Sequence, residues 1–579
     1  MHLELEHAFC GSREYPKKIK QNYGGIIMRN HKSSLRKVVS LGLCAAMLLT
    51  ACGKAKTPQT GNTEASGGTV AAEPAPSPSE APAPAADAGL HNLEDGVLDI
   101  GTSIKWDSLT PFRSQVANNA PWAAEVYETL ARLTYDKEYV PLVAKSWEGE
   151  DDGVTFNIEI YDYVYDAAGN HITAEDIVWM IESNMEAALK PSFGKVESVE
   201  QTGDYTLKVV MKQDMVGAFE QILTGGYVIS KASYEADKDG FATGIVSTAP
   251  YTITEFTPGA TMTLERREDY WQKPELIHPS CSANVQTIKY HTITEASQAG
   301  IALETGVLDG FITLDHNTVA QFEGNDKFTY VATPFINGSQ MFFSGHDSRS
   351  IANDVNLRQA ICYAIDAQGL LNAVYAGYGQ AMKDPIADTS VGWLEKWRSE
   401  DYYEYDPVKA EELLKASGYN GEELILLGGS GSQIQRLAQM IQSYLMAVGI
   451  NVKLNLVDQA LLTSIRLDGS QYDMFINTVG GDMLPDHWSI RYDMNAYKTG
   501  DGTARHDEAL AELLYSTWTR EGFTEENIDK VHIYLKDNMY AYGMVQPSNV
   551  DIWRSDLGMT EEIRISQGSH NFAACSYQE

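Results

Sequence analysis

The chain has 579 residues, of which 43% are hydrophobic and 21% are charged, a composition typical of a globular protein with about three domains. Its 44 basic and 79 acidic residues give a formal net charge of −35. A surface of that sign repels nucleic-acid phosphates and anionic membrane surfaces, so we expect no nucleic-acid partner.

The N-terminal region carries an export signal. Residues 28–51 read MRNHKSSLRKVVSLGLCAAMLLTA, a basic start followed by a short apolar run, which is typical of a signal peptide. The run is too short to cross a bilayer, which takes roughly 20 residues. Leu49, Thr50 and Ala51 precede Cys52 in the lipobox pattern of bacterial lipoproteins, so we expect Cys52 to carry a lipid. Residues 1–27 lie upstream of the signal, and we interpret them as a non-native extension.

Residues 52–90 are rich in Pro, Ala, Ser and Gly and show no apolar periodicity. Such a segment does not bury a core, so we expect a disordered tether between the lipid and the folded body. The body would then lie at the outer face of a plasma membrane, or on the periplasmic side of a Gram-negative envelope. Beyond Cys52 it contains Cys281, Cys362 and Cys575, too few for a disulfide framework. A bridge between Cys281 and Cys575 is left open.

Strands and helices alternate along the body. VLDIGTSI at 97–104 and VTFNIEI at 154–160 alternate like strands. Thr173 with Asp176 three residues later predicts the start of a helix. Residues 355–377 have apolar residues at helical spacing and predict one amphipathic helix.

The clearest segment is 406–457. Asp406 as N-cap, Pro407 at the first position and Gly418 as the stop predict a complete helix. Residues 423–457 then read as strand, Gly loop, helix and strand, which is a βαβ unit with parallel strands. The fold class is therefore α/β, with several domains.

Motifs for catalysis are missing from the sequence. GGSGSQ at 428–433 follows a strand and opens a helix, but it lacks the spacing of a dinucleotide or phosphate loop, so we interpret it as a plain loop with Ser432 capping the helix. No HExxH and no CxxC pair occurs, and an SxxK that begins at Ser34 lies in the signal peptide. We therefore expect no enzyme activity, no catalytic residue, no metal site and no cofactor.

Several blocks of the body resemble one family in order and spacing. They are LTPF at 109–112, the run from VYETL to FNIEI at 126–160, GNHITAEDIVW at 169–179, STAPY to YW at 247–271, IALETGVLDGF at 301–311 and VNLRQAICYAID at 355–366. In this set the chain resembles the family 5 extracytoplasmic solute-binding proteins, the receptors of oligopeptide, dipeptide and nickel ABC importers. Tyr161 and Asp162 depart from the family pattern, as does Ser247 in STAPY. These departures concern the shape of the local loops and not the fold.

The resemblance implies an α/β, periplasmic-binding-protein-like fold with mixed sheets, two lobes, an inserted subdomain and a ligand cleft between the lobes. Hinge closure of the lobes would enclose the ligand. The implied division is 91–126 for the start of the first lobe, 127–195 for the subdomain, 196–334 for the return to the first lobe, 335–510 for the second lobe and 511–579 for a final return.

The resemblance also implies a ligand site. Peptide receptors of the family have an aspartate that pairs with the peptide α-amino group, and Asp482 matches it by position in YDMFINTVGGDMLPDHW. A carboxylate in a closed cleft forms a strong charge-assisted bond to an ammonium. Our predicted ligand-binding residues are Asp482, Gly481, Met483, Trp488 and Trp106. Alternatives stay open: Asp482 as a turn residue and Trp106 as a core residue.

Other residues near Asp482 have different expected roles. Asp486 is expected to cap a helix that begins at His487. Arg466 or Arg491 would meet a ligand carboxylate, and the sequence does not choose between them. Asp482, Asp486 and His487 do not make a convincing metal-ligand set.

The resemblance therefore implies a lipid-anchored, monomeric receptor that binds di- to oligopeptides and delivers them to ABC permease subunits with cytoplasmic ATPases. Alternatives are a receptor for another solute, such as an oligosaccharide, a nickel chelate or a signalling peptide, or a surface lipoprotein hydrolase. The hydrolase would need a nucleophile with a base, and no motif supplies one.

Overall fold

The structure is a computed structural model that describes residues 97–112, 122–334, 337–480, 484–493, 502–559 and 571–577. The predicted export signal, Cys52 and the predicted tether lie outside the described residues. So do three predicted site residues, Gly481, Asp482 and Met483. Within the described ranges no helix is both long and apolar enough to cross a membrane.

The first lobe is built on a mixed sheet with the strand order β11-β1-β10-β9-β8. β1 pairs in parallel with β10 and β11, whereas β9 pairs antiparallel with β10 and β8. These strands are β1 (Val97–Thr102), β8 (Tyr251–Thr257), β9 (Thr261–Arg266), β10 (Thr287–Thr292) and β11 (Gly310–Ile312). A further strand of this lobe, β12 (Phe328–Pro334), lies off this path.

The second lobe is built on the strand order β16-β15-β17-β13. β15 pairs in parallel with β16 and β17, and β13 pairs antiparallel with β17. These strands are β13 (Asn337–Phe343), β15 (Leu424–Gly429), β16 (Val452–Val457) and β17 (Met474–Gly480). A further strand of this lobe, β14 (Gly379–Ala381), lies off this path.

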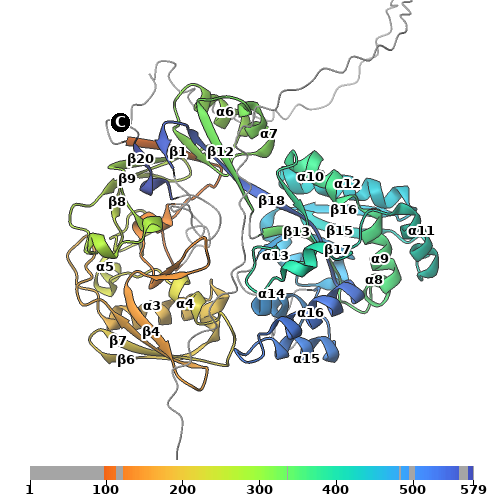
Figure 1. Ribbon diagram of the computed structural model, residues 1–579, viewed down its shortest axis with the longest axis horizontal. Coiled ribbons are helices and arrows are strands. Elements are labelled where there is room, and N and C mark those ends of the chain that lie inside the picture. The colour runs from red at the N-terminus through yellow and green to blue at the C-terminus, as the bar shows by residue number, and fades with distance from the viewer. Residues whose placement is uncertain are drawn as a thin grey trace, which may run out of the picture. The chain divides into compact units, whose positions relative to one another are not determined.

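One long strand, β18 (Ala541–Arg554), belongs to both lobes. Its first half pairs with β13 and β14, and its second half pairs with β12 and β11. Figure 1 shows β18 crossing from one group of strands to the other. Since β12 and β13 are also consecutive, the chain passes between the lobes along two neighbouring paths, which is the arrangement of a hinge.

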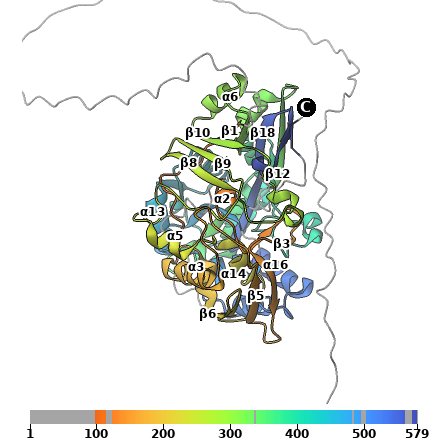
Figure 2. The ribbon, with the colours of Figure 1, turned by 90° about the vertical axis from the view of Figure 1, so that its left-hand side faces the viewer.

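A four-stranded antiparallel sheet, β4-β5-β7-β6, forms the subdomain of the first lobe. Its strands are β4 (Ala144–Gly149), β5 (Thr155–Ile160), β6 (Val196–Gly203) and β7 (Thr206–Met211). Figure 2 shows β5, β6 and α3 (Ala174–Ala187) together below β8, β9 and β10. The sheet continues past residue 195, the predicted end of the subdomain, because β6 and β7 complete it.

Helices cover the sheets, and each part has its own apolar core. The core of the second lobe includes side chains from α15 and α16, which lie beyond residue 510, the predicted end of that lobe. The helices besides α3 are α2 (Ala123–Val126), α4 (Glu220–Gly225), α5 (Lys231–Ala236), α6 (Ala296–Glu304), α7 (His316–Val319), α8 (Ser350–Asn353), α9 (Val355–Ala364), α10 (Ala367–Tyr375), α11 (Pro407–Ala416), α12 (Ser432–Ala447), α13 (Gln459–Ile465), α14 (Leu484–Tyr492), α15 (Glu508–Ser516) and α16 (Glu525–Asn538).

Two further strand pairs are short. β2 (Ala131–Leu133) pairs with β3 (Tyr139–Pro141), and β19 (Leu557–Gly558) pairs with β20 (Ser576–Tyr577).

Most local predictions are confirmed. The strands near 97 and 154 form, and the Asp176 carboxylate accepts the N–H of Thr173 at 2.8 Å at the start of α3. Asp406 caps α11, and β15, α12 and β16 form the predicted parallel βαβ unit. Two details are wrong. The helix predicted over 355–377 is two helices, because Asp366 caps α10 after α9 has ended, and Gly431 rather than Ser432 is the N-cap of α12.

Candidate functional site

Both lobes turn the carboxyl ends of parallel strands toward loops that carry predicted site residues. In the second lobe, β17 ends at Gly480 and α14 begins at Leu484; Asp482 falls between them in the sequence, outside the described residues. In the first lobe, β1 ends at Thr102 and is followed by the loop that contains Trp106. Ligands of open α/β sheets bind outside the carboxyl ends of the strands. The carboxyl ends of β1 and β17 are therefore the candidate positions for the ligand site.

The two lobes are in contact beside α14. The Asp486 carboxylate, in the first turn of this helix, forms an ion pair with the Lys195 ammonium of the subdomain and accepts an N–H from Gln221 of α4 at 3.2 Å. We call these three residues the clasp. The prediction that Asp486 caps a helix starting at His487 is wrong, because α14 already begins at Leu484 and the carboxylate reaches across to the other lobe.

A second contact lies next to the clasp. The Val216 N–H of the subdomain donates to the Trp518 carbonyl at 2.7 Å, and the Trp518 indole N–H donates to the Ser489 hydroxyl of α14 at 2.7 Å. The Arg520 guanidinium lies 5.0 Å from the ring centre of Phe156 on β5. These contacts hold the subdomain and the second lobe together, so a motion that separates the two must break them.

Trp106 lies in the core of the first lobe. It has no exposed surface, and its ring meets Trp122 and Tyr290 edge-on at centroid distances of 6.3 and 6.4 Å. The Tyr290 hydroxyl donates to the Glu125 carboxyl group at 3.0 Å. Burial raises the pKa of Glu125 to about 7, although this hydrogen bond and the charge of Arg132 oppose the rise. A carboxyl group that titrates near neutral pH therefore lies beneath the loop that follows β1.

Trp488 is fully buried in the core of the second lobe. Neither tryptophan has surface open to solvent in this structure, so direct contact with a ligand stays a prediction for both. The role of binding a ligand carboxylate stays a prediction for both Arg466 and Arg491. The Arg491 guanidinium lies 5.6 Å from the ring centre of Phe342, and Arg466 follows the end of α13. Cys281 and Cys575 are free thiols, so the bridge left open by the sequence is absent.

Lys190 is a partly buried residue that directly precedes the segment leading to the clasp. Its ammonium donates to the Gly225 carbonyl at the end of α4 and lies 4.3 Å from the ring centre of Tyr227. Burial lowers the pKa of Lys190 to about 8. The Tyr227 ring stacks on Tyr127 at 4.7 Å, and the Tyr127 hydroxyl donates to the Leu109 carbonyl of the loop after β1 at 3.2 Å. Through these contacts Lys190 is linked to the loop that follows β1.

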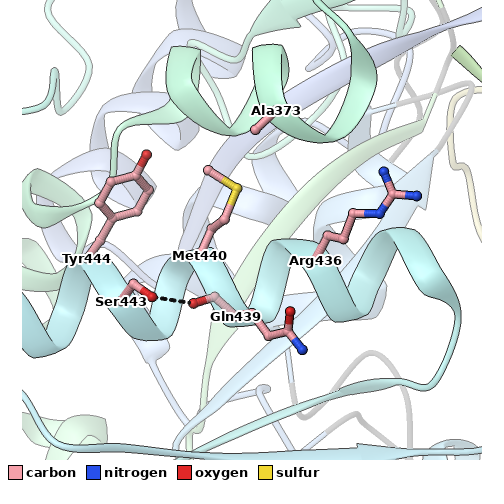
Figure 3. A pocket seen from close by; sticks show the side chains of 6 residues that line it. All are labelled: Ala373, Arg436, Gln439, Met440, Ser443 and Tyr444. Carbon is pink, nitrogen blue, oxygen red and sulfur yellow. Dashed lines mark hydrogen bonds between the residues drawn. The ribbon is translucent and has the colours of Figure 1, made fainter. Parts of the chain in front are cut away.

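A cavity of about 340 Å³ lies elsewhere, on the helical face of the second lobe. Figure 3 shows it between Ala373 of α10 and Met440 of α12. Its lining residues belong to α10 and α12, and none of them lies in the segments that follow β1 and β17, so we do not assign the ligand site to it. Among the described residues no three His, Cys, Asp or Glu side chains gather as a set that could hold a metal.

The sequence profile described as "Bacterial extracellular solute-binding proteins, family 5 Middle" matches residues 138–501. The chain belongs to this family. Family 5 proteins are the extracytoplasmic solute-binding components of ABC importers and not enzymes, so a solute and a permease are its partners. The resemblance proposed from the sequence is confirmed, as is the bilobed α/β fold.

Two relatives of this family 5 chain are each about one quarter identical to it. The glutathione-binding protein GsiB of Pectobacterium atrosepticum is 24% identical over 375 residues, which cover 63% of this chain and 70% of the relative. GsiB of Escherichia coli K12 is 24% identical over 382 residues, with the same coverage of both chains.

Solved structures share the fold. DppA of Helicobacter pylori in complex with the peptide STSA has a TM-score of 0.69 and 21% identity, and the match covers 84% of this chain and 99% of DppA. NikZ of Campylobacter jejuni in complex with Ni(L-His) has a TM-score of 0.68 and 19% identity, and the match covers 83% and 99%.

Four residues around the clasp and the loop after β1 were not predicted from the sequence: Lys190, Lys195, Gln221 and Glu125. No local pattern marks them, because each gains its role from partners far away in the sequence. Asp486 and Lys195, for example, are 291 positions apart.

Proposed function

We propose that the protein is a lipid-anchored receptor that captures di- to oligopeptides between its lobes and delivers them to an ABC permease. Cys52 carries the lipid, residues 52–90 form the tether, and the receptor acts as a monomer. Binding of the peptide shifts the equilibrium from the open toward the closed arrangement of the lobes, which the permease recognises.

The observation that carries the proposal is the position of α14. This helix starts two residues after Asp482 and contacts the subdomain of the first lobe through Asp486. A carboxylate placed there pairs with a peptide ammonium when the lobes close, and exclusion of water strengthens that bond. The strands that lead to this point offer backbone groups to a peptide main chain, which gives affinity without reading side chains.

The ligands named for similar proteins agree with a peptide. Relatives are named as glutathione-binding proteins, and DppA holds a peptide. Glutathione is itself a small peptide with an ammonium group and two carboxylates. The likeness to NikZ, which holds a nickel–histidine complex, supports a second candidate, a metal chelate.

Native mass spectrometry of protein purified without unfolding tests the proposal, because a closed receptor retains what it has captured. We expect an added mass that fragments into amino acids. A mass with the isotope pattern of nickel, or a carbohydrate mass, would replace the peptide by another solute. Release of amino acids from added peptides by the purified protein would overturn the receptor function itself.

A further inference from the structure

His316 holds the strand that joins the lobes at the point where its pairing changes from one lobe to the other. Along β18, Pro547 pairs with β14 of the second lobe, and the next residue, Ser548, pairs with β12 of the first lobe. The His316 ring nitrogen Nε2 lies 2.7 Å from the Ser548 carbonyl oxygen. Since His316 belongs to α7 of the first lobe, this bond ties that lobe to the crossing point of the hinge strand.

The same ring also contacts the second lobe. It meets the Tyr375 ring of α10 edge-on at a centroid distance of 5.4 Å, and the Tyr378 ring lies 5.9 Å away. Tyr378 in turn packs against the apolar cluster of the first lobe that surrounds α7, and its hydroxyl donates to the Glu323 carboxylate at 2.8 Å. Figure 1 shows α7 beside α10, close to β18. His316 therefore lies at the hinge and touches both lobes.

The bond to Ser548 determines which ring nitrogen carries the proton. A carbonyl oxygen only accepts, so Nε2 is the donor, and the neutral imidazole leaves Nδ1 as an acceptor without a hydrogen. Among the residues that the structure describes, Nδ1 has no hydrogen-bond partner, and only 6% of the His316 surface is exposed. A second proton would therefore create a buried, charged N–H without an acceptor, which is costly.

The groups around the ring do not supply that acceptor. α10 has no charged side chain, and the Tyr375 hydroxyl is in a hydrogen bond with the Ser339 hydroxyl at 3.1 Å. The charged side chains of the other elements have partners of their own. These are Asp315 with the N–H groups of Asn317 and Thr318, Glu323 with the Tyr378 hydroxyl, Asp551 with the N–H of Thr313, and Arg554 with Asp309.

These surroundings favour the neutral ring. Burial lowers the pKa of His316 below its ordinary value, although the bond to Ser548 and the charge of Asp315 oppose the fall. The stabilising contribution of the neutral form is complete above the ordinary value of about 6.5 and is lost as the pH falls through the lowered value. Because family 5 proteins are extracytoplasmic, the pH of the surrounding medium acts on this ring directly.

We infer that His316 is a proton-sensitive brace of the hinge. While neutral, it holds β18 at Ser548 and keeps α7 packed against α10. When protonated, the ring leaves this place to bring its Nδ1–H to water, and β18 opens more readily between the lobes. Acidification of the medium thus loosens the hinge, whichever solute the protein binds.

Hydrogen exchange of the full chain, read by mass spectrometry, tests this at pH 7.5 and pH 5.0. Labelling times are scaled to remove the intrinsic effect of pH on exchange. The reporting segments are 545–552 of β18 and 328–334 of β12. We expect about tenfold faster exchange in both at pH 5.0, the effect of one buried donor without an acceptor. Residues 155–160 of β5, in the subdomain, should show no change.

Three variants separate the proton from the bond. His316→Gln keeps a side-chain N–H for the Ser548 carbonyl but does not titrate, so exchange should be slow at both pH values. His316→Phe keeps an aromatic ring but lacks the donor, so exchange should be fast at both. His346→Gln is the matched control, because His346 is exposed in the second lobe and its ring bonds to Ser348, and it should behave like the unmodified protein. Thermal melts establish that each variant is folded.

Nitrogen-15 NMR of histidine-labelled, unmodified protein provides a second measurement that does not depend on the folding of a variant. We expect a histidine that carries its proton on Nε2 and stays neutral below pH 6.5, and the signal absent from His316→Gln assigns it.

The inference is overturned if exchange in β18 is the same at both pH values, if His316→Gln keeps the pH effect, or if every histidine titrates at its ordinary value. None of these measurements involves a ligand, so failure of the proposed peptide function leaves their outcome unchanged.

Discussion

The Lys195 ammonium forms an ion pair with the Asp486 carboxylate, and the two residues belong to different lobes. Their side chains are largely buried, with exposed fractions of 12% and 19%. Gln221 supplies a further hydrogen bond to the same carboxylate. Because the pair exists only when the lobes meet, it stabilises the closed arrangement and contributes nothing to the open one.

Asp486→Asn should therefore weaken ligand binding without removing the ligand site. A partly buried pair of this kind contributes about 1 kcal/mol, so we expect roughly fivefold weaker binding, mainly through faster dissociation. Stopped-flow tryptophan fluorescence gives the dissociation rate, and small-angle scattering reports whether the liganded protein still closes.

The matched control for the clasp is Glu159→Gln. Glu159 pairs with Lys145 at 2.6 Å, but both residues lie in the subdomain sheet and are about half exposed. Loss of an exposed pair within one sheet should leave the dissociation rate unchanged. Equal rates for Asp486→Asn and the unmodified protein would show that the clasp does not stabilise closure.

Glu125 predicts a pH dependence of stability. Its folded pKa is raised to about 7 from an ordinary value near 4.5, chiefly by burial. The protonated form is therefore favoured in the folded state: its stabilising contribution is complete below pH 4.5 and is lost as the pH rises through 7. Glu125→Gln, which is always neutral, should gain stability relative to the unmodified protein across this window, by at most about 3 kcal/mol.

Melting temperatures of both proteins between pH 5 and pH 8 check the Glu125 prediction. The difference between the two should grow with pH. Glu186→Gln is the control, because Glu186 lies exposed on α3, and its curve should run parallel to that of the unmodified protein. A parallel curve for Glu125→Gln would mean that the carboxyl group is already ionised at pH 5.

Gly543 tests the packing of the strand that joins the lobes. A Cβ at this position of β18 would lie 2.0 Å from the backbone oxygen of Asp384, which does not rotate away as a side chain does. Gly543→Ala should cost roughly 1 to 3 kcal/mol and lower the midpoint of denaturant unfolding. Gly244→Ala is the control, since nothing lies within 4 Å of its Cβ. Equal midpoints would show that the segment around Asp384 moves aside freely.

Local chemistry made the fold of the second lobe predictable. The cap at Asp406 and the apolar periodicity of α12 depend on residues a few positions apart, and both are present in the structure. The break between α9 and α10 was not predicted, because the apolar spacing continues across it. At the break the Asp366 side chain accepts the N–H of Gly369 and so caps the start of α10. An N-capping aspartate inside a periodic run is the signal that could have found it.

The lobe boundary was less predictable, because it depends on contacts distant in the sequence. Lys190 and Lys195 stand in the stretch LKPSFGK, and only the fold brings Tyr227 to the first and Asp486 to the second. Asp486 was interpreted as a helix cap, since an aspartate near the start of a helix has that role by default. Its actual partner comes from a subdomain that the local sequence does not indicate.

The predicted amine-binding role of Asp482 leads to a contrast between two ligands. Asp482→Asn removes the charge but keeps the size of the side chain, so a charge-assisted bond becomes a neutral one, with about half the strength. We expect about tenfold weaker binding of peptides with a free α-amino group and little change for N-acetylated peptides, which bind the unmodified protein weakly because they lack the ammonium. Isothermal titration with both forms of one peptide from the captured set measures this. Met483→Leu, which changes a neighbouring side chain without altering charge, is the matched control and should affect both forms alike. If Asp482→Asn weakens both forms equally, the aspartate holds the turn between β17 and α14 and does not bind the ammonium, because loss of a turn residue does not distinguish the two ligands.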